Sequence, residues 1–588
     1  MAGVRAGVNY THYIAIDFGT AGCGMVVSTS ETETPRLFNS WLPSKSEVKC
    51  PTIMLLDHKL ECEAFGHKAK TKYQQHKRSK HPEQFNNYYL FEHFKMSLYE
   101  EKNITHDMMI KAVDGKELPA IKVFSKALDY MRGIILKYLD EQVTYVTRSI
   151  LWILTVPAIW SSAAKQVMRS AAENAGFCAG HNDLKFALEP EAASLYCLNE
   201  KKDLLSAASG QHLVVDCGGG TVDIAAHNWV RDPQKNKIYV DEIHKVHGGP
   251  CGSFAINTEF EKILIELFKV DINKLKREFG GQWSKVIYND FEKSKCSFGL
   301  EEHDTSVLIP DKLQTFIKNA SGKTIPQLAM EYKRHALQWD QYDEAVVIPS
   351  VVMRKLFQPI IDQIICVIED VLETPECRSI QNIFMVGGFS QSKLLFNAVE
   401  KHFSRRATVS TGPPGISPVY SVLYGSVKFG RHHEMVRSRI MSQTLGIETW
   451  DEFVPQRHAT SKKHTDANGK CYCKQIFTKF VQVGQSMPTQ QSTSTKQVFE
   501  PVPNENNACC IKIYGSYEKE PKYIDDFSSY LVGTLTLENL PSPRSGISQE
   551  VTVHMDMRGT EITVTATNNA SRRQLPLKLD WMKDKYVS

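Results

Sequence analysis

The chain has 588 residues, of which 42% are hydrophobic and 23% are charged, and its formal net charge is +4. This length exceeds what one hydrophobic core organises, so we expect roughly two to four domains, and the composition excludes a wholly disordered or fibrous protein. Because 70 basic residues nearly balance 66 acidic ones, the charge argues against nucleic acid or a membrane surface as a partner.

No membrane or secretory segment is predicted. The longest apolar run, Ser149 to Trp160, contains Pro157 and is shorter than the roughly 20 residues that a transmembrane helix needs. Residues 1–20 contain Asp17 and lack the continuous apolar stretch of a secretory signal. We therefore expect no membrane insertion and a cytoplasmic location.

The 14 cysteines are scattered, apart from Cys471 with Cys473 and the pair Cys509 and Cys510. This spacing is not that of a disulfide framework or of paired zinc knuckles. Reduced thiols are the expected state, and a metal site built from these four thiols is the disfavoured alternative.

An internal repeat organises the first half of the chain. Residues 13–28 read YIAIDFGTAGCGMVVS, and residues 213–226 read LVVDCGGGTVDIAA. Each copy is an apolar strand, an aspartate, a turn of small residues and a second apolar strand, which predicts a β-hairpin. Asp17 and Asp216 occupy the same place in the two copies, so we expect two similar lobes that face one ligand.

Helices and buried strands alternate around these hairpins and predict an α/β architecture. The expected elements, in chain order, are a helix over Ala120 to Val143, a strand over Ser149 to Val156, a helix over Ser161 to Gly176, a strand over Ile383 to Val386 and a helix over Ser390 to His402.

The pattern changes after about residue 440, where short runs rich in Thr, Val, Ile and aromatic residues replace helical periodicity. These runs are Ile511 to Tyr514, Leu531 to Leu537, Val551 to Met555 and Glu561 to Ala566. They predict an all-β module. The charged segment Arg431 to Met441 is the expected joint between the two parts.

The two turns have the chemistry of a polyphosphate site. Glycine lets backbone N–H groups approach phosphate closely, and Gly19 with Thr20 and the run Gly218, Gly219, Gly220 and Thr221 offer this from two sides. Asp17 and Asp216 are placed to hold hydrated Mg²⁺. Asp223 lies on the same strand face as Thr221, where it could orient or deprotonate water. A simple pair of tight hairpins is the alternative, which the third glycine pair, Gly387 and Gly388, disfavours.

Two further charged residues are candidates. Glu189 begins EPEAA at a strand-to-helix junction, where a carboxylate could contact the water shell of the metal, although an exposed loop glutamate is the more common case. Lys95 lies among aromatics in FEHFKMSLY and suits a phosphate contact, with a surface lysine as an equal alternative.

Taken together, these residues resemble the heat shock protein 70 family within the actin-like (ribonuclease H-like) ATPases. The shared motifs span most of the chain: DFGT (Asp17 to Thr20), TVPA (Thr155 to Ala158), EPEAA (Glu189 to Ala193), DCGGGTVD (Asp216 to Asp223), Gly248 with Gly249, FEKSK (Phe291 to Lys295), VGGFS (Val386 to Ser390), YGS (Tyr424 to Ser426), TLGIET (Thr444 to Thr449) and VGTLTLENLP (Val532 to Pro541).

The resemblance implies a two-lobed ATPase domain over residues 1–430, a linker over 431–441 and a β-sandwich that binds peptide over 442–588, without a helical lid. It implies ATP or ADP with Mg²⁺ and K⁺ as cofactors, and extended hydrophobic peptide segments and co-chaperones as partners. Further phosphate-binding and nucleotide-binding residues would be Gly248 and Gly249.

The resemblance also assigns roles to single residues. Asp17 and Asp216 would serve Mg²⁺ and K⁺, Thr221 and Asp223 the γ-phosphate and the attacking water, and Glu189 the waters of the metal. Lys95 would be the catalytic lysine, Glu292 and Lys295 would face the ribose, and Gly387, Gly388 and Phe389 would contact the adenosine. In the β module, the peptide pocket would be lined by Ile447, Trp450, Phe499 and Cys509.

Several departures place the sequence near the divergent heat shock 70 kDa protein 12 branch. Cys296 and Gln391 replace two arginines that the family places at the adenine, which weakens stacking on the base. The first turn has Ala21 and Gly22 in place of a threonine and a tyrosine, the joint is basic, and Trp450 is bulkier than its counterpart.

Three functions fit these patterns. The first is an ATP-hydrolysing chaperone of the stress response that binds hydrophobic peptide in a nucleotide-dependent way. The second is a scaffold that holds nucleotide with weak turnover or none. The third is a small-molecule kinase of the same superfamily, which the β module disfavours.

Overall fold

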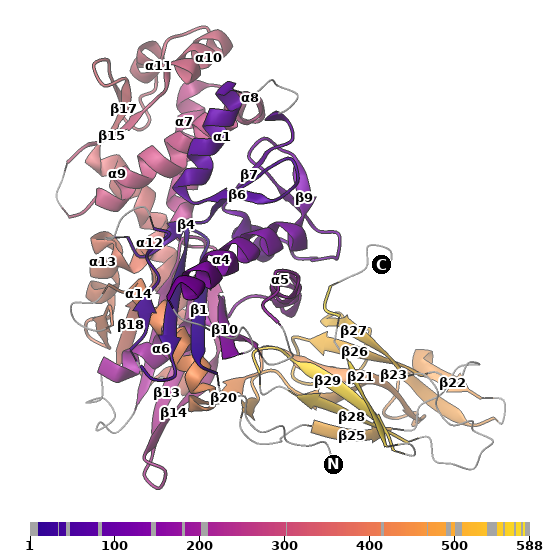
Figure 1. Ribbon diagram of the computed structural model, residues 1–588. Coiled ribbons are helices and arrows are strands. Elements are labelled where there is room, and N and C mark those ends of the chain that lie inside the picture. Colours follow the sequence, from indigo (N-terminus) through magenta and orange to yellow (C-terminus); the bar gives the residue numbers. More distant parts are fainter. Residues whose placement is uncertain are drawn as a thin grey trace.

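The computed structural model describes residues 10–32, 34–42, 47–79, 85–142, 149–178, 183–200, 210–300, 303–412, 417–466, 469–489, 495–499, 509–537, 550–556, 559–569, 572–577 and 580–582. Figure 1 shows two α/β lobes and a separate group of strands from the C-terminal part of the chain. The mixed α/β architecture that the alternating pattern predicted is present.

The first lobe is built on a six-stranded sheet that carries the first repeat. Its strand order is β11 (Leu184–Leu188), β10 (Ile150–Val156), β1 (His12–Phe18), β2 (Gly22–Thr29) and β3 (Arg36–Leu37), with β4 (Cys50–Pro51) paired to β2. Strands β1, β10 and β11 are parallel, and β10 is buried throughout, as its continuous apolar sequence predicted.

The second lobe repeats this plan with a longer sheet. Its seven strands follow the order β19 (Thr408–Ser410), β18 (Asn382–Val386), β12 (Gln211–Cys217), β13 (Val222–Asp232), β14 (Lys237–Gly249), β20 (Val436–Ile440) and β24 (Ser486–Pro488). Small antiparallel sheets extend both lobes: β5 (Ile53–Leu56), β6 (Cys62–Phe65) and β7 (Tyr89–Glu92) in the first, with β8 (Met109–Lys111) and β9 (Glu117–Pro119), and β15 (Thr305–Leu308), β16 (Gln338–Asp340) and β17 (Ala345–Ile348) in the second.

Helices cover these sheets. Those on the first lobe are α1 (His67–Ser79), α3 (Ser97–Glu100), α4 (Ala120–Gln142), α5 (Ser162–Asn174) and α14 (Tyr420–Arg431), which packs on β1, β2 and β10. Those on the second are α6 (Glu189–Glu200), which packs on β12 and β13, α7 (Phe254–Phe268), α8 (Ile272–Lys285), α9 (Phe291–Ser297), α10 (Asp311–Ser321), α11 (Ile325–Glu331), α12 (Ser350–Leu372) and α13 (Lys393–Phe403). Among the described helices, none is long and apolar enough to cross a bilayer.

The predicted helices occur with small shifts. Ser161 caps α5 by accepting a hydrogen bond from the N–H of Ala164 at 3.2 Å, as its position before the helix suggested. The helix expected from Ser390 is divided, because Phe389–Gln391 forms one 3₁₀ turn and α13 begins only at Lys393.

Helices α6 and α14 join the two lobes through a shared apolar core. This cluster takes side chains from both central sheets, including Ala15 and Leu151 from the first and Val214 from the second. The helices approach so closely that a Cβ on Gly425 would overlap the carbonyl of Ala192. The glycine of YGS therefore sets the spacing between the lobes.

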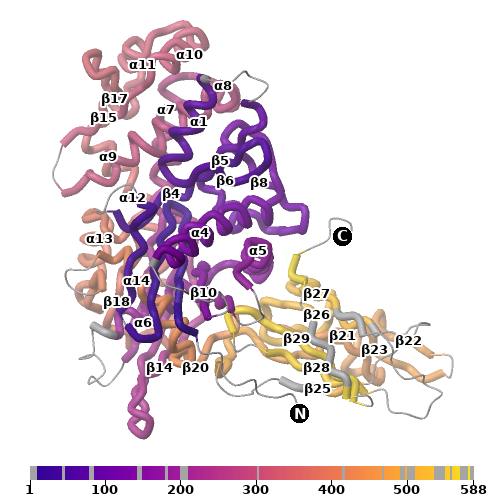
Figure 2. Tube along the Cα trace, in the orientation of Figure 1, coloured from indigo at the N-terminus to yellow at the C-terminus, as the bar shows by residue number. Residues whose placement is uncertain are grey.

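The lobes also meet at their outer ends. In Figures 1 and 2, α1 of the first lobe lies beside α7 and α8 of the second. Lys70 of α1 donates a hydrogen bond to Asn289 at 2.8 Å, and Gly281 packs near Gln74. The lobes therefore touch through α6 and α14 at one end and through α1 and the second lobe at the other. The two hairpin turns face each other between these two contact regions.

The C-terminal part consists of two antiparallel sheets that share one apolar core. One sheet has the order β22 (Lys463–Thr465), β23 (Cys471–Val481), β21 (Thr444–Glu452), β26 (Cys509–Ser516) and β27 (Ser529–Leu537), and the other has β25 (Thr495–Phe499), β28 (Val551–Asp556), β29 (Thr563–Asn568) and β30 (Arg573–Leu577). Leu445, Ile513, Val553 and Val564 from the two sheets pack in the same cluster.

The charged joint contains a strand that sequence patterns did not reveal. Residues Val436–Ile440 form β20, which pairs in parallel with β14 and antiparallel with β24. Arg437 Nε donates to Asp241 at 2.8 Å, and Arg439 Nε donates to Glu191 at 2.5 Å. The joint is therefore an inner strand of the second-lobe sheet, and ion pairs hold it to Asp241 of β14 and Glu191 of α6.

Candidate functional site

The two hairpins have the same register and the same turn length. In β1–β2, Asp17 lies opposite Gly24, and in β12–β13, Asp216 lies opposite Asp223. Four residues separate the last cross-strand pair of each hairpin: residues 19–22 lie between Phe18 and Cys23, and residues 218–221 lie between Cys217 and Val222. The repeat thus places both aspartates at the end of a strand, one residue before the last strand position.

The turns approach each other across the space between the lobes. A Cβ on Gly219 would lie 2.8 Å from the Cβ of Ala21, and one on Gly220 would lie 3.0 Å from Oγ1 of Thr20. A Cβ at Gly219 would overlap the opposite turn, and one at Gly220 would crowd Thr20 and overlap Sδ of Met96. The absence of side chains at Gly219 and Gly220 is what allows the two turns to come together.

Backbone hydrogen bonds from residues 252–254, at the start of α7, hold the second turn in place. The N–H groups of Gly252, Ser253 and Phe254 donate to the carbonyls of Gly220, Gly218 and Gly219, at 3.2, 3.1 and 2.8 Å respectively. These bonds hold the glycine-rich turn in one conformation, which a phosphate-binding loop requires.

Asp17 is buried and has two partners from outside its own hairpin. Oγ1 of Thr155, in the TVPA motif, donates to Oδ1 at 3.0 Å. Nζ of Lys49 lies 2.6 Å from Oδ2 in an ion pair whose side chains are 24% exposed for Lys49 and 3% for Asp17. Burial lowers the pKa of Lys49, but the negative charge of Asp17, followed by Asp216 and Glu189, outweighs this and leaves the pKa above its usual value.

Lys95 and Glu189 form a second buried ion pair. Lys95, only 4% exposed, donates to Oε1 of Glu189 at 2.9 Å and lies 5.2 Å from the ring centre of Trp160. The structure therefore excludes the alternative of a surface lysine at this position. Burial raises the pKa of Glu189 to about 7, against the lowering effect of Lys95.

Among the described residues, no cation forms an ion pair with Asp216 comparable to that of Lys49 with Asp17. Its pKa is raised well above the usual value by burial first, then by the charges of Glu189 and Asp223, with Lys49 acting in the opposite direction. Gly387, with φ +83°, lies so close that a Cβ there would overlap Oδ1 of Asp216. The VGGFS glycine therefore leaves room for this carboxylate.

Asp223 connects the second hairpin to the first lobe. Its Oδ1 accepts a hydrogen bond from the N–H of Ile159 at 3.1 Å, and its Oδ2 accepts one from Thr221 Oγ1 at 3.0 Å. Burial raises the pKa of Asp223 in spite of these bonds. Gly248 lies beside it in the β13–β14 ladder, and Gly249 lies opposite Val222.

The residues assigned to the nucleoside lie farther into the second lobe and are mostly engaged with protein groups. Lys295 donates to Asn257 at 2.7 Å and to the carbonyl of Ser253 at 3.0 Å, and it pairs with Glu292 at 2.8 Å. Phe389 is buried in the core of the second lobe, whereas Gly388 has open space where a Cβ would project.

The residues assigned to a peptide pocket do not converge on one surface. Ile447 is buried in the core of the C-terminal sheets, and Phe499 packs against the same core. Trp450 is 44% exposed, with Nζ of Lys474 lying 4.5 Å from its ring centre. The backbone of Cys509 pairs with Leu537 in β26–β27, but its side chain lies outside the described residues.

Magnesium fits this site through water rather than through direct ligands. Within the described ranges, no three His, Cys, Asp or Glu side chains converge closely enough to hold a metal directly. The raised pKa values of Glu189, Asp216 and Asp223 nevertheless show buried carboxylates that lack sufficient positive charge. Mg²⁺ commonly keeps several waters and uses few carboxylates together with phosphate oxygens, which matches this arrangement.

Sequence reasoning missed three side chains that shape the first turn. Lys49 and Thr155 hold Asp17, and Thr52 donates to the carbonyl of Gly19 at 2.6 Å. Thr155 belongs to the TVPA motif, whose sequence alone assigns no role to this residue. No local pattern marks Lys49 or Thr52, because their function depends on the pairing of β4 with β2.

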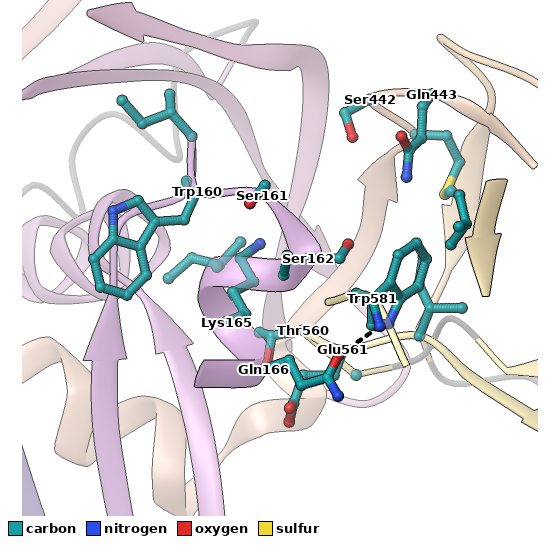
Figure 3. A pocket seen from close by; sticks show the side chains of 18 of the residues that line it. Trp160, Ser161, Ser162, Lys165, Gln166, Ser442, Gln443, Thr560, Glu561 and Trp581 are labelled. Atoms are coloured by element: carbon teal, nitrogen blue, oxygen red, sulfur yellow. Dashed lines mark hydrogen bonds between the residues drawn. The ribbon is translucent and has the colours of Figure 1, made fainter. Parts of the chain in front are cut away.

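A large cavity of about 1760 Å³ separates the first lobe from the C-terminal sheets. Figure 3 shows Trp160 and Lys165 on one side and Ser442, Gln443 and Trp581 on the other, with Gln166, Thr560 and Glu561 close together between them. The cavity is bridged at its rim, where Gln166 accepts from the N–H of Trp581 at 2.6 Å and Arg169 Nε donates to Glu561 at 3.1 Å. Ile159 and Trp160 also line it, so one short segment touches both this cavity and the Asp223–Lys95 region.

Comparisons with known proteins agree with these features. A family model described as Hsp70 protein matches residues 72–229. Heat shock 70 kDa protein 12B of Homo sapiens is 28% identical over 98% of this chain and 92% of its own length. Heat shock 70 kDa protein 12A of Homo sapiens and that of Mus musculus are each 27% identical over 97% of this chain and 91% of their own lengths.

Proposed function

We propose that this chain is a nucleotide-regulated chaperone, because an Hsp70 family model matches residues 72–229 and because the chain resembles heat shock 70 kDa proteins 12A and 12B over nearly its whole length. It binds ATP with Mg²⁺ between its lobes, hydrolyses it, and binds extended hydrophobic peptide segments through its C-terminal sheets. Its action is placed in the cytoplasm, with co-chaperones as further partners.

The observation that carries the nucleotide part of this proposal is the pair of opposed hairpin turns. They bring Asp17 and Asp216 to one space, beside the buried Lys95–Glu189 pair. A tight hairpin needs neither a buried lysine nor several buried carboxylates, and burying such groups costs free energy. Their concentration here is explained by a charged ligand and its metal ion.

Bound Mg²⁺ would supply charge neutralisation at the phosphates, held through water by Asp17, Asp216 and Glu189. The chain's own groups do the remaining work. The second turn presents backbone N–H groups to phosphate, and Lys95 supplies a positive charge in a water-poor site. Asp223, held by Thr221 and by the N–H of Ile159, is positioned to orient water for attack on the γ-phosphate.

The C-terminal sheets are proposed to form a β-sandwich that binds peptide, with the ATPase domain over 1–430, a linker over 431–441 and this domain over 442–588. Two sheets around one core support the proposal. Coupling between the parts would pass through Ile159 and Trp160, which contact the nucleotide site and line the cavity against the C-terminal sheets.

A nucleotide-holding scaffold with slow turnover is the second candidate. The engagement of Lys295 by Ser253, Asn257 and Glu292 favours it, because this lysine is not free to turn toward a ribose without breaking these contacts. Cys296 also favours the scaffold, because it lacks the guanidinium group that would stack on the base.

Nucleotide turnover with and without an apolar peptide separates these functions. We expect tight Mg·ATP binding in calorimetry and turnover that the peptide stimulates, with Lys95→Met retaining binding but losing turnover at least about 100-fold. Binding without turnover supports the scaffold, and turnover that requires a small hydroxylated acceptor supports a kinase. No heat with any adenine nucleotide, from folded protein with Mg²⁺ present, would contradict all three.

A further inference from the structure

Lys49 reaches Asp17 through space that the first hairpin leaves for it. Strand β4 pairs with β2 at Gly22 and Cys23, which fixes the backbone of Lys49 beside the turn. A Cβ on Gly22 would lie 3.1 Å from the Cβ of Lys49, and one on Gly24 would lie 3.4 Å from its Cγ. The lysine stem thus runs over two glycines, and β4 holds it in place.

The ammonium group ends at the aspartate of the first hairpin. Nζ lies 2.6 Å from Oδ2 of Asp17, and a Cβ on Gly19 would lie 3.8 Å from the same Nζ. Oδ1 of Asp17 is held by Thr155, so both carboxylate oxygens have a partner from the protein. In the second hairpin, Asp223 occupies the position that Gly24 has in the first.

We propose that Lys49 is the resident monovalent cation of the nucleotide site, occupying the place beside Asp17 that would otherwise require a free K⁺ ion. This inference rests on the proposed function of the site for its consequence in nucleotide binding. It replaces the expectation that Asp17 serves K⁺. Nucleotide binding by this chain is then independent of the monovalent metal ion at this position.

The charges of the buried site support this assignment. The carboxylates of Asp17, Glu189, Asp216 and Asp223 face the ammonium groups of Lys49 and Lys95. When all four carboxylates are ionised, two negative charges remain, which one divalent ion balances. Without Lys49 the excess would be three, and a monovalent ion would be needed in addition. An ammonium group and K⁺ carry the same charge, so either can fill this place beside a carboxylate.

The test compares the wild-type protein with Lys49→Met, which keeps the length of the side chain and removes its charge. Melting temperatures of the nucleotide-free proteins are measured in potassium chloride and in N-methylglucamine chloride of equal ionic strength. We expect the wild-type value to change by less than about 1 °C, and the variant to melt about 3 °C lower or more in N-methylglucamine and to recover in potassium. Lys49→Arg restores the wild-type pattern, and Lys59→Met, at an exposed lysine, is the matched control.

The second readout is Mg·ADP affinity in the same two salts. We expect a difference of less than about two-fold for the wild type, and about ten-fold weaker binding by Lys49→Met in N-methylglucamine than in potassium. Equal salt responses of the two proteins, in melting temperature and in affinity, would overturn the inference. If neither protein binds nucleotide but the melting temperatures behave as expected, the proposed function fails and the role of Lys49 stands.

Discussion

The two hairpins share a backbone plan but differ in the charges around their aspartates. Asp17 lies opposite Gly24, and the missing side chain there leaves space for Lys49. Asp216 lies opposite Asp223, so a second carboxylate stands where the first hairpin has a lysine stem. Asp17 is in an ion pair, whereas the pKa of Asp216 is raised well above its usual value, first by burial and then by the charges of Glu189 and Asp223.

This difference shows that the repeat sets positions and the surrounding elements set chemistry. Lys49 comes from the segment before β4, and Thr155 comes from β10, neither of which belongs to the repeat. The first carboxylate is paired with Lys49 and hydrogen-bonded by Thr155, and we infer that the second requires a cation from outside the chain. We therefore infer that contacts within the protein hold the aspartate of the first hairpin, whereas the aspartate of the second hairpin depends on a bound cation.

We expect the largest difference between the hairpins when the charge of each aspartate is removed in turn and the stability of the protein is measured. Asp17→Asn leaves the ammonium of Lys49 without its partner, so we expect a loss of stability of about 2–3 kcal/mol, somewhat below the cost for a fully buried pair because Lys49 is partly exposed. Asp216→Asn removes a buried carboxylate that forms no ion pair within the described part of the chain, so we expect a gain of about 1 kcal/mol. Denaturant unfolding with EDTA and without nucleotide measures both.

The two effects must have opposite signs. Asp140→Asn, on the exposed face of α4, is the control and should change stability by less than about 0.5 kcal/mol. Destabilisation by both site variants would show that Asp216 is stabilised by contacts rather than strained by charge, and the distinction between the hairpins would be lost.

The first glycine of each turn shows that the two turns also differ in how much room their backbones leave for a side chain. A Cβ on Gly19 would overlap the carbonyl of Gly22 inside its own turn, whereas a Cβ on Gly218 would meet the carbonyl of Thr221 at 3.0 Å. We expect Gly19→Ala to cost about 2 kcal/mol and Gly218→Ala about 1 kcal/mol or less, because only the first forces a backbone shift. Equal losses in denaturant unfolding would show that the two turns are equally constrained.

The sequence predicted the hairpins because their pattern is local. Asp17, Asp216 and the glycines all lie within two short segments, and the buried strand at Ile150–Val156 and helix α5 are equally local patterns. The pairing of Lys95 with Glu189 joins residues 94 positions apart, and only the family resemblance brought them together before the structure did.

The features that escaped prediction depend on tertiary pairing. Lys49 is 32 positions from Asp17 and reaches it only because β4 pairs with β2. Strand β20 was hidden for a related reason, since the sequence RHHEMVRSRIM has no apolar alternation and its arginines are satisfied by Asp241 and Glu191 of other elements. Both cases involve charged residues whose partners lie far away in the sequence, where periodicity carries no information.

The buried carboxylates also give the stability of the metal-free protein a pH dependence. The pKa of Glu189 is raised by burial to about 7, from 4.5 in a solvated chain, and that of Asp216 is raised well above 3.8. A raised carboxyl pKa means that the folded state keeps a proton that the unfolded state releases. The stability contributed by protonated Glu189 is therefore complete below about pH 4.5 and is lost as the pH rises through about 7.

Glu189→Gln should remove this contribution, so the stability of the variant relative to wild type should rise between pH 5 and 7, by at most ~1.4 kcal/mol per pH unit. Asp216→Asn should flatten the dependence as well, and the double variant should flatten it by less than the two changes together, because each carboxylate raises the pKa of the other. Denaturant unfolding at half-unit pH intervals measures these slopes, and saturating Mg²⁺ should reduce the wild-type slope by favouring the ionised carboxylates. If neither Mg²⁺ nor Glu189→Gln alters the wild-type slope, the pH dependence does not come from the carboxylates of this site. Asp216 would then need no added cation, and the two hairpins would not differ in this respect.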